Sequence, residues 1–194
     1  MKLVCIPAVD EEKMIGDMIK KSLQYADKVI VCDDGSKDNT AKIARQSGAQ
    51  VISHTKNQGY GAAIITLFEA ARKENADSMV TIDGDGQHDP DQIPLLLDTI
   101  SEHNVDVVIG SRFLNKRSDS PGYRKRGIKI ITSASNFGTD FKVTDAQSGF
   151  RAYSKNAINS IHPTETGMSI STEILLKISN KGLSLAEVPI SISY

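Results

Sequence analysis

The residues best suited to chemistry lie between positions 83 and 89, in the stretch DGDGQHD. Asp83, Asp85 and Asp89 follow an apolar run, and glycines separate the first two and then follow the second. Three carboxylates this close repel one another unless a cation offsets their charge. Mg²⁺ and Mn²⁺ prefer such oxygen ligands, and glycines let the backbone approach a phosphate closely. The pattern predicts a loop that holds a divalent cation beside phosphates, and the simpler alternative is an acidic turn that faces solvent.

Two neighbours of this cluster have simpler interpretations. Asp89 precedes Pro90, an order typical of the N-cap and the first position of a helix, so we expect Asp89 to be a cap. His88 is expected to be a loop residue rather than a metal ligand, because no His or Cys lies near it with ligand spacing.

Polar clusters also follow the other apolar runs of the N-terminal half. They are Asp10 and Glu11, Asp33 and Asp34, residues 57–61, and Ser111 with Arg112. We expect Asp33 to brace its turn and Ser36 to cap the next helix. If the apolar runs are parallel strands, their carboxyl ends share one edge of the sheet, which is where open α/β sheets bind ligands.

The elements that must position these residues alternate along the chain. Strands are expected at 3–7, 28–32, 50–53, 78–82, 105–110, 150–153 and 183–190, and helices at 11–25, 39–47, 62–73, from 90 onward, at 127–137 and at 171–179. The strands are continuous apolar runs, which is typical of strands that are buried on both faces. The expected fold class is therefore α/β, a doubly wound and mainly parallel sheet with helices on both faces.

Composition narrows the function. The 194 residues carry 23 basic and 24 acidic side chains, for a net charge of −1, which does not favour nucleic-acid binding. No stretch approaches the length of a membrane span, and the N-terminus does not resemble a signal peptide, so we expect a cytoplasmic protein. Cys5 and Cys32 lie in apolar runs and are expected to be buried free thiols.

Five short motifs occur in a definite order. They are IPAVDEE at 6–12, VCDDGS at 31–36, NQGYGA at 57–62, DGDGQ at 83–87 and QSGFR at 147–151. Together they resemble the family 2 glycosyltransferases with the GT-A fold, and among these the dolichol-phosphate or polyprenyl-phosphate mannosyl- or glucosyltransferases. The resemblance covers essentially the whole chain. One departure is Val9-Asp10, where the family usually has Tyr-Asn, and it bears on recognition of the base.

The resemblance implies roles for individual residues. Asp85 and Gln87 would contact the metal, either Mg²⁺ or Mn²⁺, and Asp83 the ribose or a group behind the metal ligands. The nucleotide-binding residues would be Pro7, Asp10, Glu11, Asp34, Gly59 and Asp83, and the catalytic residues would be Asp85, Arg112, Arg124 and Arg126. The two glycines around Tyr60 do not form a dinucleotide fingerprint, which needs three glycines after the first strand.

The acceptor remains open between two chemistries. A phosphate acceptor is mostly a dianion at neutral pH and needs cations rather than a base, and Arg112, Arg124 and Arg126 are suited to binding it. A hydroxyl acceptor would need a general base, for which Asp145 is the candidate. Residues 115–126 are polar and carry several of these cations, so we expect a mobile loop there.

The expected function is therefore inverting, metal-dependent transfer of a hexose from a UDP- or GDP-sugar to a polyprenyl or dolichyl phosphate, at the cytoplasmic face of a membrane. The alternatives are a saccharide hydroxyl acceptor and a non-catalytic module that binds sugar nucleotides. A signalling receiver fits less well, because its acidic pair would follow the first strand. We expect residues 1–194 to form a single GT-A domain. Relatives usually continue past the position of Tyr194, which leaves a C-terminal truncation open.

Overall fold

A central sheet organises the molecule. The computed structural model describes residues 1–114 and 142–192, and within them seven strands form one sheet in the order β3-β2-β1-β4-β6-β5-β7. The strands are β1 Lys2–Ala8, β2 Lys28–Asp33, β3 Gln50–Ser53, β4 Ser78–Thr81, β5 Val107–Ser111, β6 Arg151–Ser154 and β7 Leu185–Pro189. Strand β6 runs antiparallel to both of its neighbours, and the other pairs of strands are parallel.

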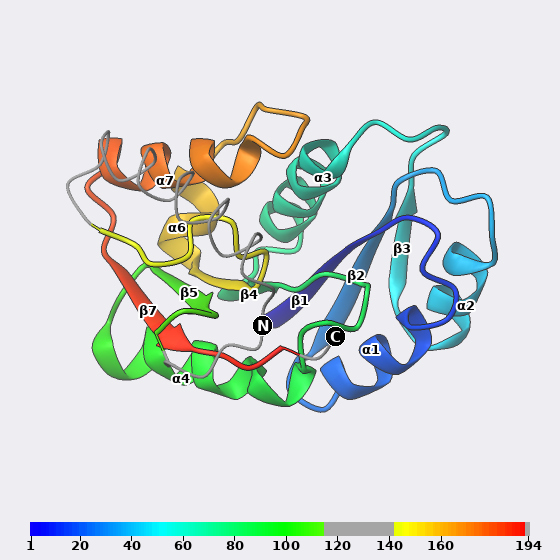
Figure 1. Cartoon of the computed structure of the whole chain (residues 1–194), viewed down its shortest axis with the longest axis horizontal. Helices are drawn as coiled ribbons and strands as arrows, with labels where there is room; N and C mark the ends of the chain where they lie inside the picture. Colours follow the sequence, from blue (N-terminus) through cyan, green and yellow to red (C-terminus); the bar gives the residue numbers. More distant parts are fainter. Residues whose placement is uncertain (115–141, 193–194) are drawn as a thin grey trace.

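Helices cover both faces of this sheet (Figure 1). They are α1 Ile15–Ser22, α2 Thr40–Gln46, α3 Tyr60–Lys73, the 3₁₀ turn η1 Pro90–Gln92, α4 Ile93–His103, α6 Lys155–Ser160 and α7 Ile170–Asn180. Helices α3, α6 and α7 lie on one face, and α1, α2 and α4 lie on the other. Successive residues of a strand point to opposite faces, so Leu3 and Cys5 join the first of these cores and Val4 and Ile6 the second. The predicted fold class is confirmed.

The first predicted helix is shorter than expected. We predicted a helix over 11–25, and α1 begins only at Ile15. The backbone N–H of Glu11 donates to Thr40 Oγ1 at 2.7 Å, and the N–H of Glu12 donates to Asp38 Oδ2 at 3.1 Å. These bonds hold residues 11–14 against the start of α2 as a turn, a tertiary contact that helical periodicity does not report.

Other helices also differ from the prediction. The helix predicted from Pro90 begins as the 3₁₀ turn η1 and continues as α4. Helix α6 was not predicted, because its six residues are too few to show a clear period. The helix predicted at 127–137 lies outside the described residues.

The antiparallel strand β6 brings a distant motif to the functional edge. Because β6 runs against β4 and β5, it begins at the edge where those strands end. The turn that precedes it, which includes Gly149, therefore lies beside Asp83. A Cβ atom at Gly149 would lie 2.5 Å from Asp83 Oδ2, so any larger residue there would displace the carboxylate of Asp83.

Both cysteines are buried free thiols, as predicted. Burial raises the pKa of Cys5 and raises that of Cys32 to about 12, so both thiols keep their protons at neutral pH.

Across residues 1–114 and 142–192, we find no helix whose length and apolar character would let it cross a membrane.

Candidate functional site

A pocket of about 300 Å³ opens at the carboxyl ends of β1, β2 and β4. Five of the predicted site residues line it: Pro7, Glu11, Asp34, Asp83 and Asp85. They come from three separate stretches of the chain, so the parallel strands bring them together as the sequence predicts. Neutral and apolar side chains complete the wall, among them Asn57, Tyr60, Gln147 and Met168.

Asp83 is the most perturbed carboxylate of the pocket. Burial and the charge of Asp85 together raise its pKa to about 6, while a hydrogen bond from Tyr60 and the charges of Arg112 and Arg151 oppose them. The Tyr60 hydroxyl donates to Asp83 Oδ1 over 3.1 Å. The pair Asp83 and Asp85 is therefore a concentrated negative charge that the protein offsets only in part.

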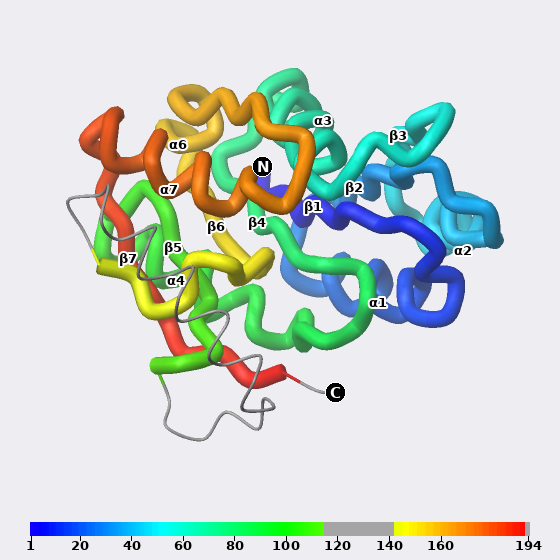
Figure 2. Tube along the Cα trace, turned by 45° about the horizontal axis from the view of Figure 1, so that its top comes forward, coloured from blue at the N-terminus to red at the C-terminus, as the bar shows by residue number. Residues whose placement is uncertain are grey.

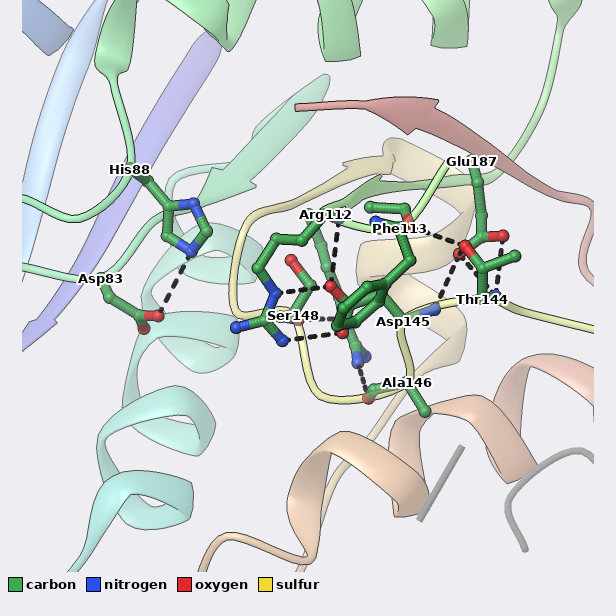
Figure 3. A network of polar contacts seen from close by, with 11 residues as sticks. Asp83, His88, Arg112, Phe113, Thr144, Asp145, Ala146, Ser148 and Glu187 are labelled. Atoms are coloured by element: carbon green, nitrogen blue, oxygen red, sulfur yellow. Dashed lines mark hydrogen bonds and ion pairs between the residues drawn. The ribbon is translucent and has the colours of Figure 1, made fainter. Parts of the chain in front are cut away.

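His88 lies in the loop between β4 and η1, as expected of a loop residue, but it is buried there. Its side chain is only 5% exposed, and its ring packs on Phe150 with the centroids 5.4 Å apart. Nε2 lies 3.9 Å from Asp83 Oδ2, which is too long for a hydrogen bond (Figure 3). Burial lowers the pKa of His88 to about 4, so its ring is neutral at neutral pH. The prediction for Asp89 is confirmed, since its Oδ1 accepts from the N–H of Asp91 at the start of η1.

Asp34 occupies the wall at the end of β2. It is 4% exposed, and it accepts hydrogen bonds from the backbone N–H groups of Gln58 and Gly59 at 2.9 and 2.8 Å. A third contact joins Asp34 Oδ1 to His54 Nδ1 at 2.6 Å. Asp34 thus fixes the turn after β3 while it also lines the pocket.

The neighbouring acid braces the turn, as predicted, and the expected cap is absent. Asp33 Oδ1 accepts from the N–H of Ser36 at 3.3 Å. Ser36 does not cap α2. Its hydroxyl instead accepts from the N–H of Asp10 at 3.0 Å, and α2 begins after Asn39 with no side-chain cap. Ser36, in the loop after β2, therefore binds the chain that follows β1, and this tertiary contact occupies the hydroxyl that would otherwise cap α2.

Three predicted binding residues do not line the pocket. Asp10 is exposed, and its Oδ1 accepts from the N–H of Lys37 at 2.7 Å. The side chain of Gln87 is absent from the pocket wall, although its N–H donates to Asp85 Oδ1 at 2.9 Å. Gly59 has a φ of 102°, and a Cβ there would lie 2.6 Å from the carbonyl oxygen of Thr166, so its glycine is explained by the fold.

That close approach has a visible cause. The segment that leads into α7 runs alongside the N-terminal end of α3 (Figure 2). The N–H of Ala62 donates to the Thr166 carbonyl at 3.2 Å, and a Cβ atom at Gly61 would collide with the carbonyl oxygen of Glu165. Met168, 62% exposed, lies in this segment and forms part of the rim of the pocket.

Arg112 is held in an ion pair close to the pocket. Its Nε and Nη2 donate to the two oxygens of Asp145 at 2.6 and 2.7 Å, and Asp145 is fully buried (Figure 3). Glu187 of β7 accepts from the N–H groups of Thr144 and Asp145 and so holds this loop in turn. Asp145, the candidate general base, therefore has both oxygens engaged by a guanidinium. Arg124 and Arg126 lie outside the described residues.

The residue types fit a divalent cation. In residues 1–114 and 142–192, no group of three or more His, Cys, Asp or Glu side chains could hold a metal alone. Mg²⁺ and Mn²⁺ commonly take one or two carboxylates from the protein and the remaining ligands from phosphate and water. The adjacent carboxylates of Asp83 and Asp85 are the kind of partial ligand set that such an ion needs.

Sequence reasoning missed several residues of the site. Tyr60 belongs to the motif NQGYGA but was assigned no role, and its position in a glycine-flanked helix start is the only signal that singles it out. His54, Asn57 and Met168 carry no pattern of their own. Their placement depends on how α3 and the segment before α7 pack against the sheet.

Comparisons with known proteins agree with this geometry. The family model described as Glycosyl transferase family 2 matches residues 3–161. A UDP-N-acetylglucosamine–dolichyl-phosphate N-acetylglucosaminyltransferase of Methanococcus voltae is 33% identical, over 97% of this chain and 84% of the relative. A dolichyl-phosphate hexose transferase of Haloferax volcanii is also 33% identical, over 96% of this chain and 80% of the relative.

The fold also matches a solved structure. Glucosyl-3-phosphoglycerate synthase of Mycobacterium tuberculosis, crystallised with Mn²⁺, UDP and glucosyl-3-phosphoglycerate, superposes with a TM-score of 0.80. The sequences are 23% identical, and the match covers 100% of this chain and 71% of that one. This chain therefore belongs to glycosyl transferase family 2, and it is a glycosyltransferase with the GT-A fold.

Proposed function

We propose that this glycosyltransferase transfers a hexose from a UDP- or GDP-sugar to a polyprenyl or dolichyl phosphate, with a divalent cation and with inversion at the anomeric carbon. The observation that carries the proposal is the pocket in which Asp34, Asp83 and Asp85 meet Pro7 and Glu11 at one edge of the sheet. It is concave, lies where open α/β sheets bind ligands, and is lined by four carboxylates.

The donor half of the proposal follows from these carboxylates. Asp34, with Pro7 and Glu11, would contact the base or the ribose, and Asp83 the ribose. Asp85 would hold Mg²⁺ or Mn²⁺ with Asp83 beside it, whereas the side chain of Gln87 does not line the pocket. The bound cation would offset the negative charge that develops on the departing diphosphate. The M. tuberculosis neighbour, crystallised with Mn²⁺ and UDP, supports this assignment.

The reaction would be a single in-line displacement. An oxygen of the acceptor phosphate forms a bond to the anomeric carbon of the sugar on the side opposite the diphosphate. The bond from that carbon to the diphosphate oxygen breaks, and its electron pair leaves with the nucleoside diphosphate. One displacement inverts the configuration of the anomeric carbon.

The acceptor half of the proposal follows from the negative charge of a phosphate acceptor. A phosphate monoester is mostly dianionic at neutral pH, so it attacks without a general base and instead needs cations to hold it beside an anionic donor. Arg112, Arg124 and Arg126 would supply them. The names of the M. voltae and H. volcanii relatives, both of which act on dolichyl phosphate, support a lipid phosphate. Such an acceptor implies work at a membrane surface.

A hydroxyl acceptor is less favoured by the geometry. It would need Asp145 as the base, and both oxygens of that carboxylate already accept from Arg112. Asp145 is also fully buried and does not line the pocket, so it is poorly placed to take a proton from an acceptor that binds there.

A panel of donors and acceptors tests the proposal. Purified protein is incubated with UDP-glucose, UDP-N-acetylglucosamine, GDP-mannose and Mg²⁺ or Mn²⁺, and with either a short-chain prenyl phosphate or a simple sugar alcohol as acceptor. We expect transfer to the prenyl phosphate and little to the alcohol. Transfer only to the alcohol would overturn the lipid-phosphate assignment in favour of a hydroxyl acceptor.

A double variant separates the acceptor from the donor. Changing Arg124 and Arg126 together to Gln should lower the rate of transfer to prenyl phosphate at least about tenfold, the scale of one charge-assisted hydrogen bond. The affinity for the nucleoside diphosphate should change much less. A normal transfer rate in this variant would show that these arginines do not bind the acceptor.

A further inference from the structure

His54 makes three polar contacts directly behind the wall of the pocket. It lies just after β3, outside the pocket lining, and its side chain is 10% exposed. Nδ1 lies 2.6 Å from Asp34 Oδ1, and Nε2 lies 2.9 Å from Thr66 Oγ1 on α3 and 3.6 Å from Cys32 Sγ. The ring thus bridges α3 to the carboxylate at the end of β2.

The Cys32, His54 and Asp34 side chains are the types found in cysteine nucleophile triads, but the chemistry does not fit one. Cys32 is fully buried, is absent from the pocket lining, and keeps its proton because burial raises its pKa to about 12. A nucleophile must be a thiolate within reach of substrate. The role of His54 therefore has to be sought in its bond to Asp34.

The hydrogen bonds determine which nitrogen of the ring carries the proton. An ionised carboxylate only accepts, so a contact of 2.6 Å requires a proton on Nδ1. The Thr66 hydroxyl lies 2.9 Å from Nε2, and it can donate to that nitrogen in the neutral ring or accept from it in the charged ring. In either form Thr66 holds the ring in the orientation in which Nδ1 faces Asp34.

Asp34 is left with a limited capacity for a ligand. A carboxylate has about four acceptor positions. On Oδ1 they are taken by His54 and the N–H of Gln58, and on Oδ2 one is taken by the N–H of Gly59. About one acceptor position therefore remains, on Oδ2. Because Asp34 lines the pocket, a ligand there can donate a hydrogen bond to Asp34 from one direction only.

We propose that His54 is a positioning residue for donor binding: oriented by Thr66, it donates to Asp34 and fixes the one acceptor position that Asp34 offers to the nucleoside. The inference rests on the proposed donor function. It assigns to α3, through Thr66, a part in the geometry of the nucleoside end of the pocket. Loss of the His54 bond leaves the carboxylate of Asp34 held only by the N–H groups of Gln58 and Gly59, so its orientation is less firmly fixed and those two bonds weaken.

Two substitutions of the same histidine separate this role from packing. In His54→Asn the amide nitrogen is attached at the same atom as Nδ1 and can still donate to Asp34. In His54→Gln the amide lies one bond further out, near the position of Nε2, and the donor to Asp34 is lost. The exposed His103 on α4 supplies a control, His103→Gln, that touches none of these groups.

Calorimetric titration with UDP and with GDP in Mn²⁺ measures the effect. We expect His54→Gln to weaken the better of these ligands about tenfold, and His54→Asn to stay within about threefold of the wild-type protein. His103→Gln should bind like wild type. Equal affinity of His54→Gln and wild type, or equal losses in both His54 variants, would overturn the proposal.

Amide hydrogen exchange provides a second measurement that needs no ligand. The N–H groups of Gln58 and Gly59 should exchange faster in His54→Gln than in His54→Asn. Only His54→Gln loses the hydrogen bond from residue 54 to Asp34, the carboxylate that accepts from both N–H groups. Equal exchange rates in the two variants would overturn the positioning role. If the wild-type protein binds neither UDP nor GDP, the proposed donor function fails, and the exchange rates still decide whether His54 positions Asp34.

Discussion

At the scale of single residues, the site is dominated by negative charge that the fold neutralises only in part. Asp83 is buried beside Asp85, and together burial and repulsion raise its pKa to about 6. The Tyr60 hydroxyl offsets some of this cost through a hydrogen bond to Asp83 Oδ1. A site that leaves such charge uncompensated is prepared to bind a cation, because binding relieves the repulsion.

Removing that hydrogen bond should therefore weaken ligand binding. Tyr60→Phe leaves the ring in place but deprives Asp83 of the donor that orients it. We expect the affinity for UDP in Mn²⁺ to fall about fivefold, which corresponds to the loss of about 1 kcal/mol for one hydrogen bond. Calorimetric titration measures this change.

Tyr25→Phe is the matched control. The Tyr25 hydroxyl also donates to a carboxylate, Asp91 Oδ1 at 2.9 Å, but Tyr25 does not line the pocket. The control should bind UDP like the wild-type protein. Similar losses in the two variants would mean that the effect of Tyr60 is not specific to Asp83.

At the scale of elements, one carboxylate, that of Asp106, connects several elements at the edge of the sheet opposite the pocket. Asp106, next to the start of β5, accepts from Ser184 just before β7, from Asn156 of α6 and from Ser154 of β6. Asp106 thus joins the start of β5 to segments near β7, β6 and α6 that are far apart in the sequence. Although burial raises the pKa of Asp106, hydrogen bonds from Asn156 and Ser184 outweigh it, and the pKa is lowered overall.

Asp106→Asn should lower the free energy of unfolding near neutral pH. The amide nitrogen replaces an acceptor with a donor, so at least one bond to Ser184 or Asn156 is lost. Asp106 is partly exposed, and we expect a loss of about 1 kcal/mol after allowing for solvent. Urea unfolding of the variant and the wild-type protein measures it.

The difference in the free energy of unfolding between Asp106→Asn and the wild-type protein should also depend on pH. The folded pKa of Asp106 is lowered, so its stabilisation is complete above the unfolded value of about 3.9 and is lost as the pH falls through the folded value. The gap between variant and wild type should therefore shrink when unfolding is measured at about pH 3. A gap that stays constant across this range would contradict a contribution from the ionised carboxylate.

At the scale of the whole molecule, the pocket is assembled from strand ends that only the sheet brings together. Asp34 follows β2, Asp83 and Asp85 follow β4, and Pro7 belongs to β1. A ligand that contacts all three strands binds only the folded state, so it must stabilise the entire fold by mass action. At a ligand concentration of about one hundred times Kd, this gain is about 2.7 kcal/mol.

Thermal unfolding should report this gain and its dependence on the cation. For a chain of this size we expect saturating UDP with Mn²⁺ to raise Tm by roughly 5–10 °C. EDTA should abolish the shift, and Asp85→Asn should reduce it strongly, because the variant lacks the carboxylate that we propose as a metal ligand. An equal shift with and without EDTA would count against a cation-dependent donor site.

The sequence by itself determined the layout of the fold. Continuous apolar runs such as 28–32 are buried on both faces wherever they occur in a parallel sheet, so their composition predicts both the strand and its helical cover. Polar residues that follow those runs, Asp34 and Asp83 among them, must then reach one edge, and they do. The cap at Asp89 was also predictable, since the bond from Asp89 to the N–H of Asp91 is local.

The tertiary structure decided what depends on contacts between distant segments. The direction of β6 places Gly149 against Asp83, although nothing in residues 147–151 indicates an antiparallel strand. Likewise Tyr60 and His54 acquire roles only because α3 packs over β1 and β2, which brings Tyr60 to Asp83 beyond the end of β4 and Thr66 to His54. Local sequence sets backbone preference and burial, whereas the partner of a buried polar group is set by packing, because it must be found among whatever groups the fold brings within about 3 Å.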